Sequence, residues 1–287
     1  MGRIRRVVAV SSLAGLVLVL SACAHPATTA GPPPAPYAGP LWIAPDPAVD
    51  RWKDPGAAGK VVDCDFDAHV VGATSSDPFS GGEVGDTAAA ALKEARDEGT
   101  WDGYGDMEVV REEPDRVLYG YAGGGRTLQA VIVRYGPAVD GTGAGADGLA
   151  WWVESWARCD VAEYPPEVTD DLDYEFWTDA DGRRQPIRAI TSYEGGDCVA
   201  GTHFLELGRS GGDAAELQVY VAHGEAFPDF FAEPYRADVD LPSDAVDTGF
   251  SREGDHLWLS PDQKRAYVGT AERVDLWPRT IQPLGCA

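Results

Sequence analysis

The longest hydrophobic run of the chain extends from Val7 to Leu20 and follows three arginines. Its 14 residues would span about 21 Å as a helix, whereas the hydrocarbon core of a bilayer is about 30 Å thick. A short apolar run behind a basic start is typical of a signal sequence. We therefore interpret residues 1–22 as a signal peptide, and we expect no membrane-spanning helix later in the chain.

Proline-rich sequence follows the signal and continues through Pro32-Pro33-Pro34 to Pro40. Such sequence is extended and cannot bury a hydrophobic core. We expect a semi-rigid tether from residue 24 to about residue 45, within a linking segment 23–50. Folded structure should then occupy residues 51–287.

The clearest helical pattern lies between Asp86 and Glu98. Asp86 or Thr87 can cap the free N–H groups of the first turn, and Gly99 suits the left-handed conformation that often ends a helix. A narrow apolar stripe on this helix is formed by Ala88, Ala91, Leu92 and Ala95.

β-Branched and aromatic residues that flank turn-forming residues predict two antiparallel hairpins. Val117–Tyr121 leads through three glycines into Leu128–Tyr135, and Leu257–Leu259 leads through a Ser-Pro-Asp-Gln turn into Arg265–Val268. A tryptophan-bearing strand follows each hairpin, at Trp151–Trp156 and at Val274–Trp277.

These hairpins indicate a faint internal repeat, because Val110–Leu118 can be aligned with Phe250–Trp258. We predict an α+β fold made of two tandem, weakly repeated modules dominated by antiparallel sheet. Residues 51–165 form the first module, which carries one packed helix, and residues 166–287 form the second.

The signal ends in Leu20-Ser21-Ala22-Cys23, which resembles the lipobox of bacterial lipoproteins. The resemblance implies that a diacylglyceryl group is attached to the Cys23 sulfur and that the chain is cleaved before Cys23. The alternatives are an ordinary secretory signal cleaved near Ser21–Ala24 and, from Arg5-Arg6, export by the twin-arginine route. With lipid on Cys23, the protein is expected on the outer face of the cell membrane.

A wider resemblance is to uncharacterised lipoproteins of high-GC Gram-positive bacteria. It is carried by Trp156–Glu163, Leu241–Phe250 and Leu257–Asp262. It supports the expected location and implies no known activity.

Four cysteines remain besides Cys23, an even number that predicts two disulfides in an oxidising compartment. Three connectivities are possible, and no pair has the C-x-x-C spacing of a redox or zinc site. The repeat favours Cys64–Cys159 and Cys198–Cys286, one bond in each module.

The formal charge of −24 becomes −27 without the signal, which contains three arginines and no acid. A surface this acidic repels nucleic acid and other polyanions. It could attract cations or a basic protein, although a solvated surface that keeps an exported protein soluble is the simpler interpretation.

Ser210 lies in a G-x-S-x-G pattern, Gly208–Gly212, with His223 or His256 as the nearest candidate bases. The nucleophile of a serine hydrolase needs a strand before it and a helix after it. Leu217–Val221 instead predicts a strand, so we expect a hairpin loop. Gly141–Ala146 resembles a dinucleotide-binding pattern but leads into another predicted strand, so it too is interpreted as a loop.

Acidic clusters raise the question of calcium. Asp63, Asp65 and Asp67 would share one face of a strand, but the glycine and the acid required later in a calcium loop are missing. Asp179–Gly182 is better interpreted as a turn. Alternation also places Trp152 and Trp156 on one face of their strand and Trp151 on the other, so that one of them could serve as an exposed aromatic platform.

No set of residues forms a coherent catalytic or metal site, and we assign no cofactor. The sequence favours a non-enzymatic surface lipoprotein that binds a cell-envelope protein or glycan. The alternatives are a secreted hydrolase that uses acidic residues or Ser210, and a calcium-dependent binding module.

Overall fold

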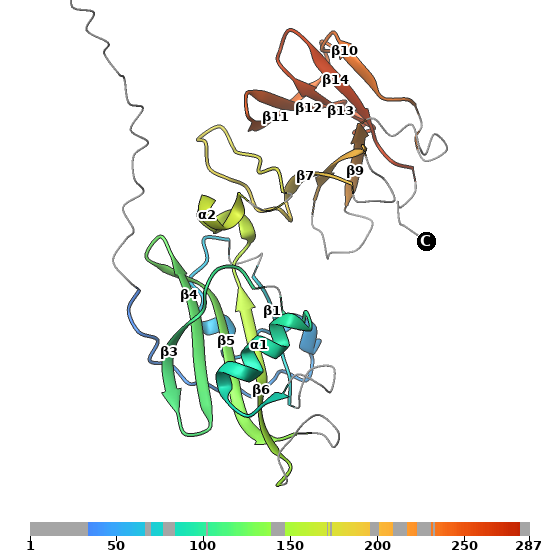
Figure 1. Cartoon of the computed structure of the whole chain (residues 1–287). Helices are drawn as coiled ribbons and strands as arrows, with labels where there is room; N and C mark the ends of the chain where they lie inside the picture. The colour runs from blue at the N-terminus through green and yellow to red at the C-terminus, as the bar shows by residue number, and fades with distance from the viewer. Residues whose placement is uncertain are drawn as a thin grey trace, which may run out of the picture. The chain divides into compact units, whose positions relative to one another are not determined.

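The computed structural model shows a fold made mostly of antiparallel strands with few helices (Figure 1). Within the residues it describes, no helix combines the length and the apolar character needed to cross a bilayer. These residues are 34–66, 70–76, 84–101, 103–138, 147–170, 172, 174–195, 201–208, 217–222, 231 and 233–281.

The first sheet has six antiparallel strands, in the order β1-β6-β5-β4-β3 with β2 also paired to β6. The predicted glycine-turn hairpin is confirmed by the pairing of β4 with β5, and the predicted tryptophan-bearing strand by β6. The strands are β1 (Val71–Thr74), β2 (Val84–Gly85), β3 (Glu108–Glu113), β4 (Arg116–Gly123), β5 (Arg126–Pro137) and β6 (Leu149–Arg158).

The predicted helix is confirmed as α1 (Ala88–Asp97), which packs on one face of this sheet. The Thr87 hydroxyl accepts a hydrogen bond from the Ala90 N–H at 3.1 Å, and Gly99 has a φ of +71°. Three alanines of the stripe are buried, where they contact strand residues such as Val131. Small side chains let the helix approach the sheet closely.

The opposite face of the sheet is covered by the segment that precedes β1, with the short 3₁₀ helices η1 (Arg51–Lys53) and η2 (Ala58–Lys60). Leu41 is only 3% exposed and packs in a cluster with Ile132 of β5. Arg111 of β3 donates to the Gly39 carbonyl at 2.8 Å. The predicted tether is therefore too long, because the chain already packs on the sheet from Tyr37 onward.

Truncation of Leu41 tests this packing. Leu41→Ala is expected to lower the free energy of unfolding by about 2–3 kcal/mol, the lower part of the range for buried leucines. The matched control is Trp42→Ala, because the neighbouring Trp42 side chain is 52% exposed. Urea unfolding of both variants measures the difference. Equal, small losses of unfolding free energy would mean that the contacts of residues 37–43 with the sheet do not stabilise the fold.

A β-bulge in β6 overturns the prediction about its tryptophans. Ser155 pairs with Ile132 and Val153 pairs with Val133, so Glu154 is an extra residue that shifts the alternation by one. Trp156 consequently joins Val153 on the α1 side of the sheet. Trp152 is fully buried and Trp151 is half-buried, so none of them forms an exposed platform.

Beyond β6 come the short helices η5 (Val161–Glu163) and α2 (Pro166–Thr169), followed by two smaller sheets. One sheet has the order β7-β8-β9 and the other β10-β14-β13-β12-β11. The pairing of β12 with β13 confirms the second predicted hairpin. The strands are β7 (Ile190–Glu194), β8 (His203–Leu207), β9 (Gln218–Ala222), β10 (Arg236–Val239), β11 (Val246–Arg252), β12 (Asp255–Leu259), β13 (Arg265–Gly269) and β14 (Val274–Pro278).

These two sheets share one hydrophobic cluster, in which Leu205 and Tyr220 pack with Leu257 and Trp277 around the fully buried Trp177. The Trp177 indole N–H donates to the Ser192 hydroxyl at 2.7 Å. This bond satisfies the buried N–H group and fixes the ring next to β7.

Candidate functional site

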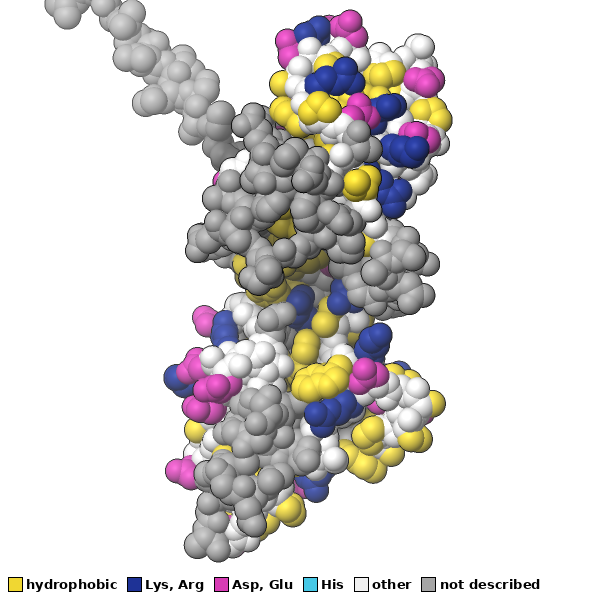
Figure 2. Space-filling model, turned by 90° about the vertical axis from the view of Figure 1, so that its right-hand side faces the viewer, with side chains coloured by type: hydrophobic (Ala, Val, Ile, Leu, Met, Phe, Trp, Pro, Cys, Tyr) yellow, Lys and Arg dark blue, Asp and Glu magenta, His cyan; other side chains and the backbone are white. Residues whose placement is uncertain are grey.

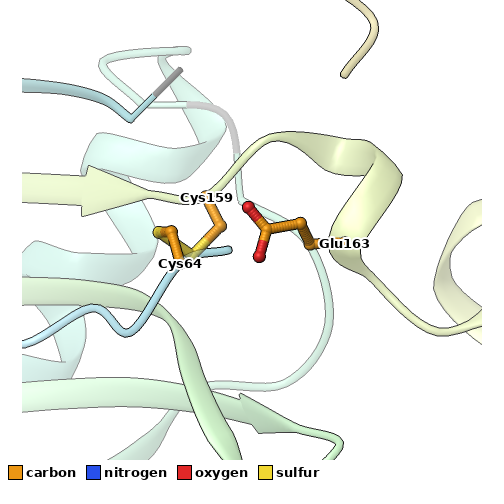
Figure 3. Close-up of side chains that lie close together, drawn as sticks. All are labelled: Cys64, Cys159 and Glu163. Atoms are coloured by element: carbon orange, nitrogen blue, oxygen red, sulfur yellow. A yellow bond between two sulfur atoms is a disulfide. The ribbon is translucent and has the colours of Figure 1, made fainter. Parts of the chain in front are cut away.

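One of the two predicted disulfides is present, between Cys64 and Cys159 (Figure 3). Cys64 lies before β1 and Cys159 directly follows β6. Because β1 and β6 are paired antiparallel strands, the sheet brings the two cysteines together, with their Cα atoms 5.3 Å apart. The second predicted bond, Cys198–Cys286, lies outside the described residues.

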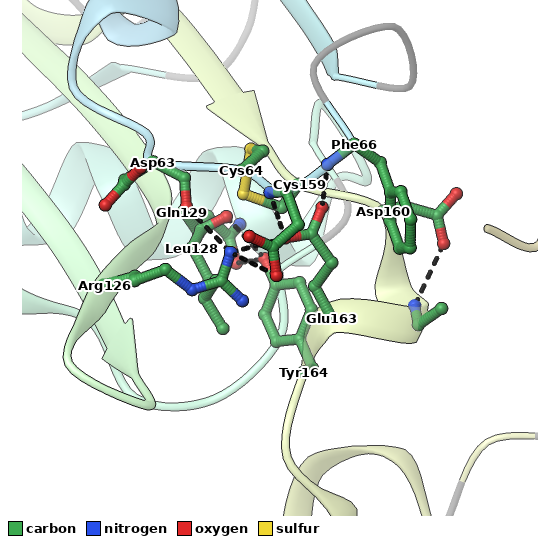
Figure 4. Close-up of a disulfide and its surroundings, with 12 residues drawn as sticks. Asp63, Cys64, Phe66, Arg126, Leu128, Gln129, Cys159, Asp160, Glu163 and Tyr164 are labelled. Carbon is green, nitrogen blue, oxygen red and sulfur yellow. Dashed lines mark hydrogen bonds and ion pairs between the residues drawn. A yellow bond between two sulfur atoms is a disulfide. The ribbon is translucent and has the colours of Figure 1, made fainter. Parts of the chain in front are cut away.

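The carboxylate of Glu163 lies beside this disulfide and holds the chain next to Cys64 (Figure 4). It accepts hydrogen bonds from the backbone N–H groups of Asp65 at 2.7 Å and Phe66 at 3.1 Å, and it pairs with Arg126 at 2.8 Å. The two sulfurs and a Glu163 oxygen lie within 4.8 Å of one another. Bonded sulfurs offer no thiolate to a metal, so we interpret this arrangement as structural.

The predicted carboxylate face around Cys64 does not form, because residues 62–66 are not a strand. Asp65 instead pairs with Arg126 at 3.1 Å. His256 lies on β12 with its ring next to Trp258. Several other candidates lie outside the described residues: Cys23, Asp67, Gly141–Ala146, Ser210 and His223.

Asp179–Gly182 forms the predicted turn. One oxygen of Asp179 accepts the N–H groups of Asp181 and Arg183, both at 3.0 Å, and the other accepts the Gln185 amide at 3.0 Å. Both oxygens of this carboxylate are therefore used in holding the turn, which disfavours a calcium site there.

Two polar cavities lie among the described residues after residue 165, and both are lined by Glu175 and Arg252. The first, which we call the Trp277 cavity, has a volume of about 410 Å³. The second, the Tyr174 cavity, has a volume of about 380 Å³. Both volumes fall within the range of about 300–1,000 Å³ that is usual for small-molecule sites.

The ion pair of Glu175 and Arg252, which lines both cavities, is held in place by contacts with buried residues. Arg252, at the end of β11, donates to the Ser192 hydroxyl at 2.8 Å, and its guanidinium lies 5.2 Å from the ring centre of Trp177. Burial lowers the pKa of Arg252, while nearby Asp255 raises it. The Arg252 side chain is 16% exposed and that of Glu175 is 38% exposed, so the pair is anchored in the core yet accessible from the cavities.

The Trp277 cavity is bordered by a second set of paired charges. Arg273 pairs with Asp238 at 2.5 Å and with Asp240 at 3.0 Å, and the bond from Arg273 lowers the pKa of Asp238. The Tyr235 hydroxyl donates to Asp275 at 2.7 Å. Carboxylates and guanidinium groups therefore lie side by side at this cavity.

The Tyr174 cavity adds aromatic surface. The guanidinium of Arg184 lies 4.6 Å from the ring centre of Phe176 and donates to the Thr169 hydroxyl at 3.2 Å. Tyr174, next to Phe176, is 37% exposed. A partly exposed ring beside charged hydrogen-bonding groups can stack on a ligand while neighbouring groups orient it.

Sequence reasoning missed both cavities, because their residues come from α2, β8 to β14 and the connections between them. The one sequence feature that pointed to these cavities was the charged segment Arg252–Asp255, which lies within the stretch Phe250–Trp258 aligned in the internal repeat. Comparisons with family models, curated proteins and solved structures give no match to the chain.

Proposed function

We propose that the protein is an exported lipoprotein, anchored through Cys23 to the outer face of the cell membrane, that binds a ligand without chemically changing it. The signal, the lipobox resemblance and the proline-rich stretch support the anchor. The two cavities that share the Glu175–Arg252 pair carry the binding function.

The state of the carboxylates favours binding over hydrolysis. A general acid needs a raised pKa so that it holds its proton near neutral pH. Arg273 does the opposite to Asp238 by lowering its pKa, and Glu175 is paired with Arg252. A carboxylate that is paired with an arginine is a hydrogen-bond acceptor, which suits recognition. A hydrolase based on these acids or on Ser210 remains the alternative.

The balance of charges on the surface also bears on the partner. Acidic and basic side chains are interspersed on the face drawn in Figure 2, with hydrophobic side chains among them. A protein that binds nucleic acid needs a cationic surface to attract the phosphates. The large acidic excess of this chain therefore favours an uncharged envelope partner over nucleic acid.

We also propose that the two larger sheets derive from an internal repeat. In both sheets the first strand in the sequence pairs with the last, and the remaining strands follow in reverse sequence order. The orders are β1-β6-β5-β4-β3 and β10-β14-β13-β12-β11. In this proposal the helix α1 belongs to the first copy alone, and residues 166–287 form the second module.

The anchor is tested by substituting its attachment residue. Cys23→Ala should abolish lipid labelling in cells that incorporate radiolabelled palmitate, and should leave the precursor unprocessed or release the protein from the membrane fraction. Ser12→Ala, within the same signal, is the control and should be processed normally. Membrane attachment and processing that are unchanged in Cys23→Ala would overturn the proposal.

A further inference from the structure

We propose that the Trp277 and Tyr174 cavities are adjacent subsites for one neutral oligosaccharide, which crosses the Glu175–Arg252 pair. This inference rests on the proposed binding function and specifies its ligand. Glu175 and Arg252 line both cavities, so the two subsites are neighbours that share these residues.

The lining groups match a polyhydroxylated ligand. Neighbouring sugar hydroxyls can donate to a carboxylate and accept from a guanidinium, and both kinds of group line these cavities. Arg252 is fixed by Ser192, and Arg184 by Thr169. The exposed part of Tyr174 supplies an apolar surface for the C–H face of a sugar ring.

Charge argues for a neutral ligand. A polyanion would meet six carboxylates against only three guanidinium groups on the same walls. An uncharged ligand avoids this repulsion while it uses both kinds of hydrogen-bonding group. The acids are Asp170, Glu175, Asp238, Glu253, Asp255 and Asp275, and the bases are Arg184, Arg252 and Arg273.

Isothermal titration calorimetry of the full chain in mild detergent tests the inference. The neutral probes are maltotetraose and tetra-N-acetylchitotetraose, each compared with its disaccharide. Tetragalacturonate serves as the anionic comparison and tetralysine as the cationic one. At least one neutral tetrasaccharide should bind, about tenfold more tightly than its disaccharide, because only the longer chain reaches both subsites.

Substitution of Tyr174 locates the binding. Tyr174→Ala should weaken tetrasaccharide binding about tenfold at an unchanged melting temperature. Tyr135→Ala is the matched control, because Tyr135 is also 37% exposed but lies on β5. Arg252→Lys, which keeps the charge but loses the forked geometry, should weaken the tetrasaccharide more than the disaccharide.

Three results would overturn the inference. They are the absence of binding by both neutral tetrasaccharides, equal or tighter binding of a charged probe, and equal effects of Tyr174→Ala and Tyr135→Ala. Binding of tetralysine alone would leave a binding protein with a different ligand. Failure of the anchor would show in the Cys23→Ala fractionation, which is independent of the calorimetry.

Discussion

Replacing Glu154 by alanine should lower the free energy of unfolding by about 3–5 kcal/mol, the cost of removing one partner from a buried ion pair. The Glu154 side chain is 4% exposed. It receives hydrogen bonds from Arg116 at 2.8 and 3.0 Å and from Arg134 at 3.3 Å. In the variant, Arg134 loses this carboxylate partner, and Arg116 keeps only its pair with the half-exposed Asp115. Urea unfolding followed by circular dichroism measures the loss.

Glu113→Ala is the matched control for this experiment. Glu113 also pairs with an arginine, Arg111, but its side chain is 32% exposed. Solvent weakens such a pair, so its removal should cost less than about 1 kcal/mol. Because Arg116 and Arg134 are themselves 13% and 30% exposed, we expect the Glu154 value near the lower end of its range. Equal losses in the two variants would contradict a special stabilising role for the buried Glu154 pairs.

The double substitution Cys64→Ala/Cys159→Ala should cost about 4–5 kcal/mol in the chain-entropy model. The bond joins residues separated by 95 positions, so its removal greatly increases the conformational freedom of the unfolded chain. Denaturant titration of the oxidised wild type and of the variant measures the difference. A loss below about 1 kcal/mol would show that the contacts around Glu163 hold this region together without the bond.

The parallel variant Cys198→Ala/Cys286→Ala provides the comparison. These cysteines are 88 positions apart, so the predicted bond between them should contribute a similar amount. Peptide mapping without reduction identifies the connectivity directly. A peptide that links Cys198 to a cysteine other than Cys286 would disprove the predicted pairing.

The elements that could be predicted from the sequence are those with local causes. Thr87 and Gly99 mark the ends of α1 within a few residues of the helix itself. The glycine turn between β4 and β5 likewise depends on adjacent residues. The Cys64–Cys159 bond was predicted from module boundaries, and the pairing of β1 with β6 explains it.

Features that depend on distant partners could not be predicted. The bulge at Glu154 reverses the faces of the tryptophans, yet its causes lie on neighbouring strands, where Arg116 and Arg134 bind the displaced carboxylate. Leu41 lies among prolines and has no periodic pattern to reveal its burial. The cavities depend on the arrangement of strands from two sheets, which no local motif encodes.

The packing of residues from Tyr37 onward also limits how far from the membrane an anchored molecule could bind its ligand. Tyr37 lies only 14 positions after Cys23, a contour of at most about 50 Å even when fully stretched. With lipid on Cys23, the first sheet would be confined to a thin shell above the bilayer. The binding site would have a high effective concentration toward ligands within that shell. Ligands farther out in the envelope could bind only if part of them extended toward the membrane.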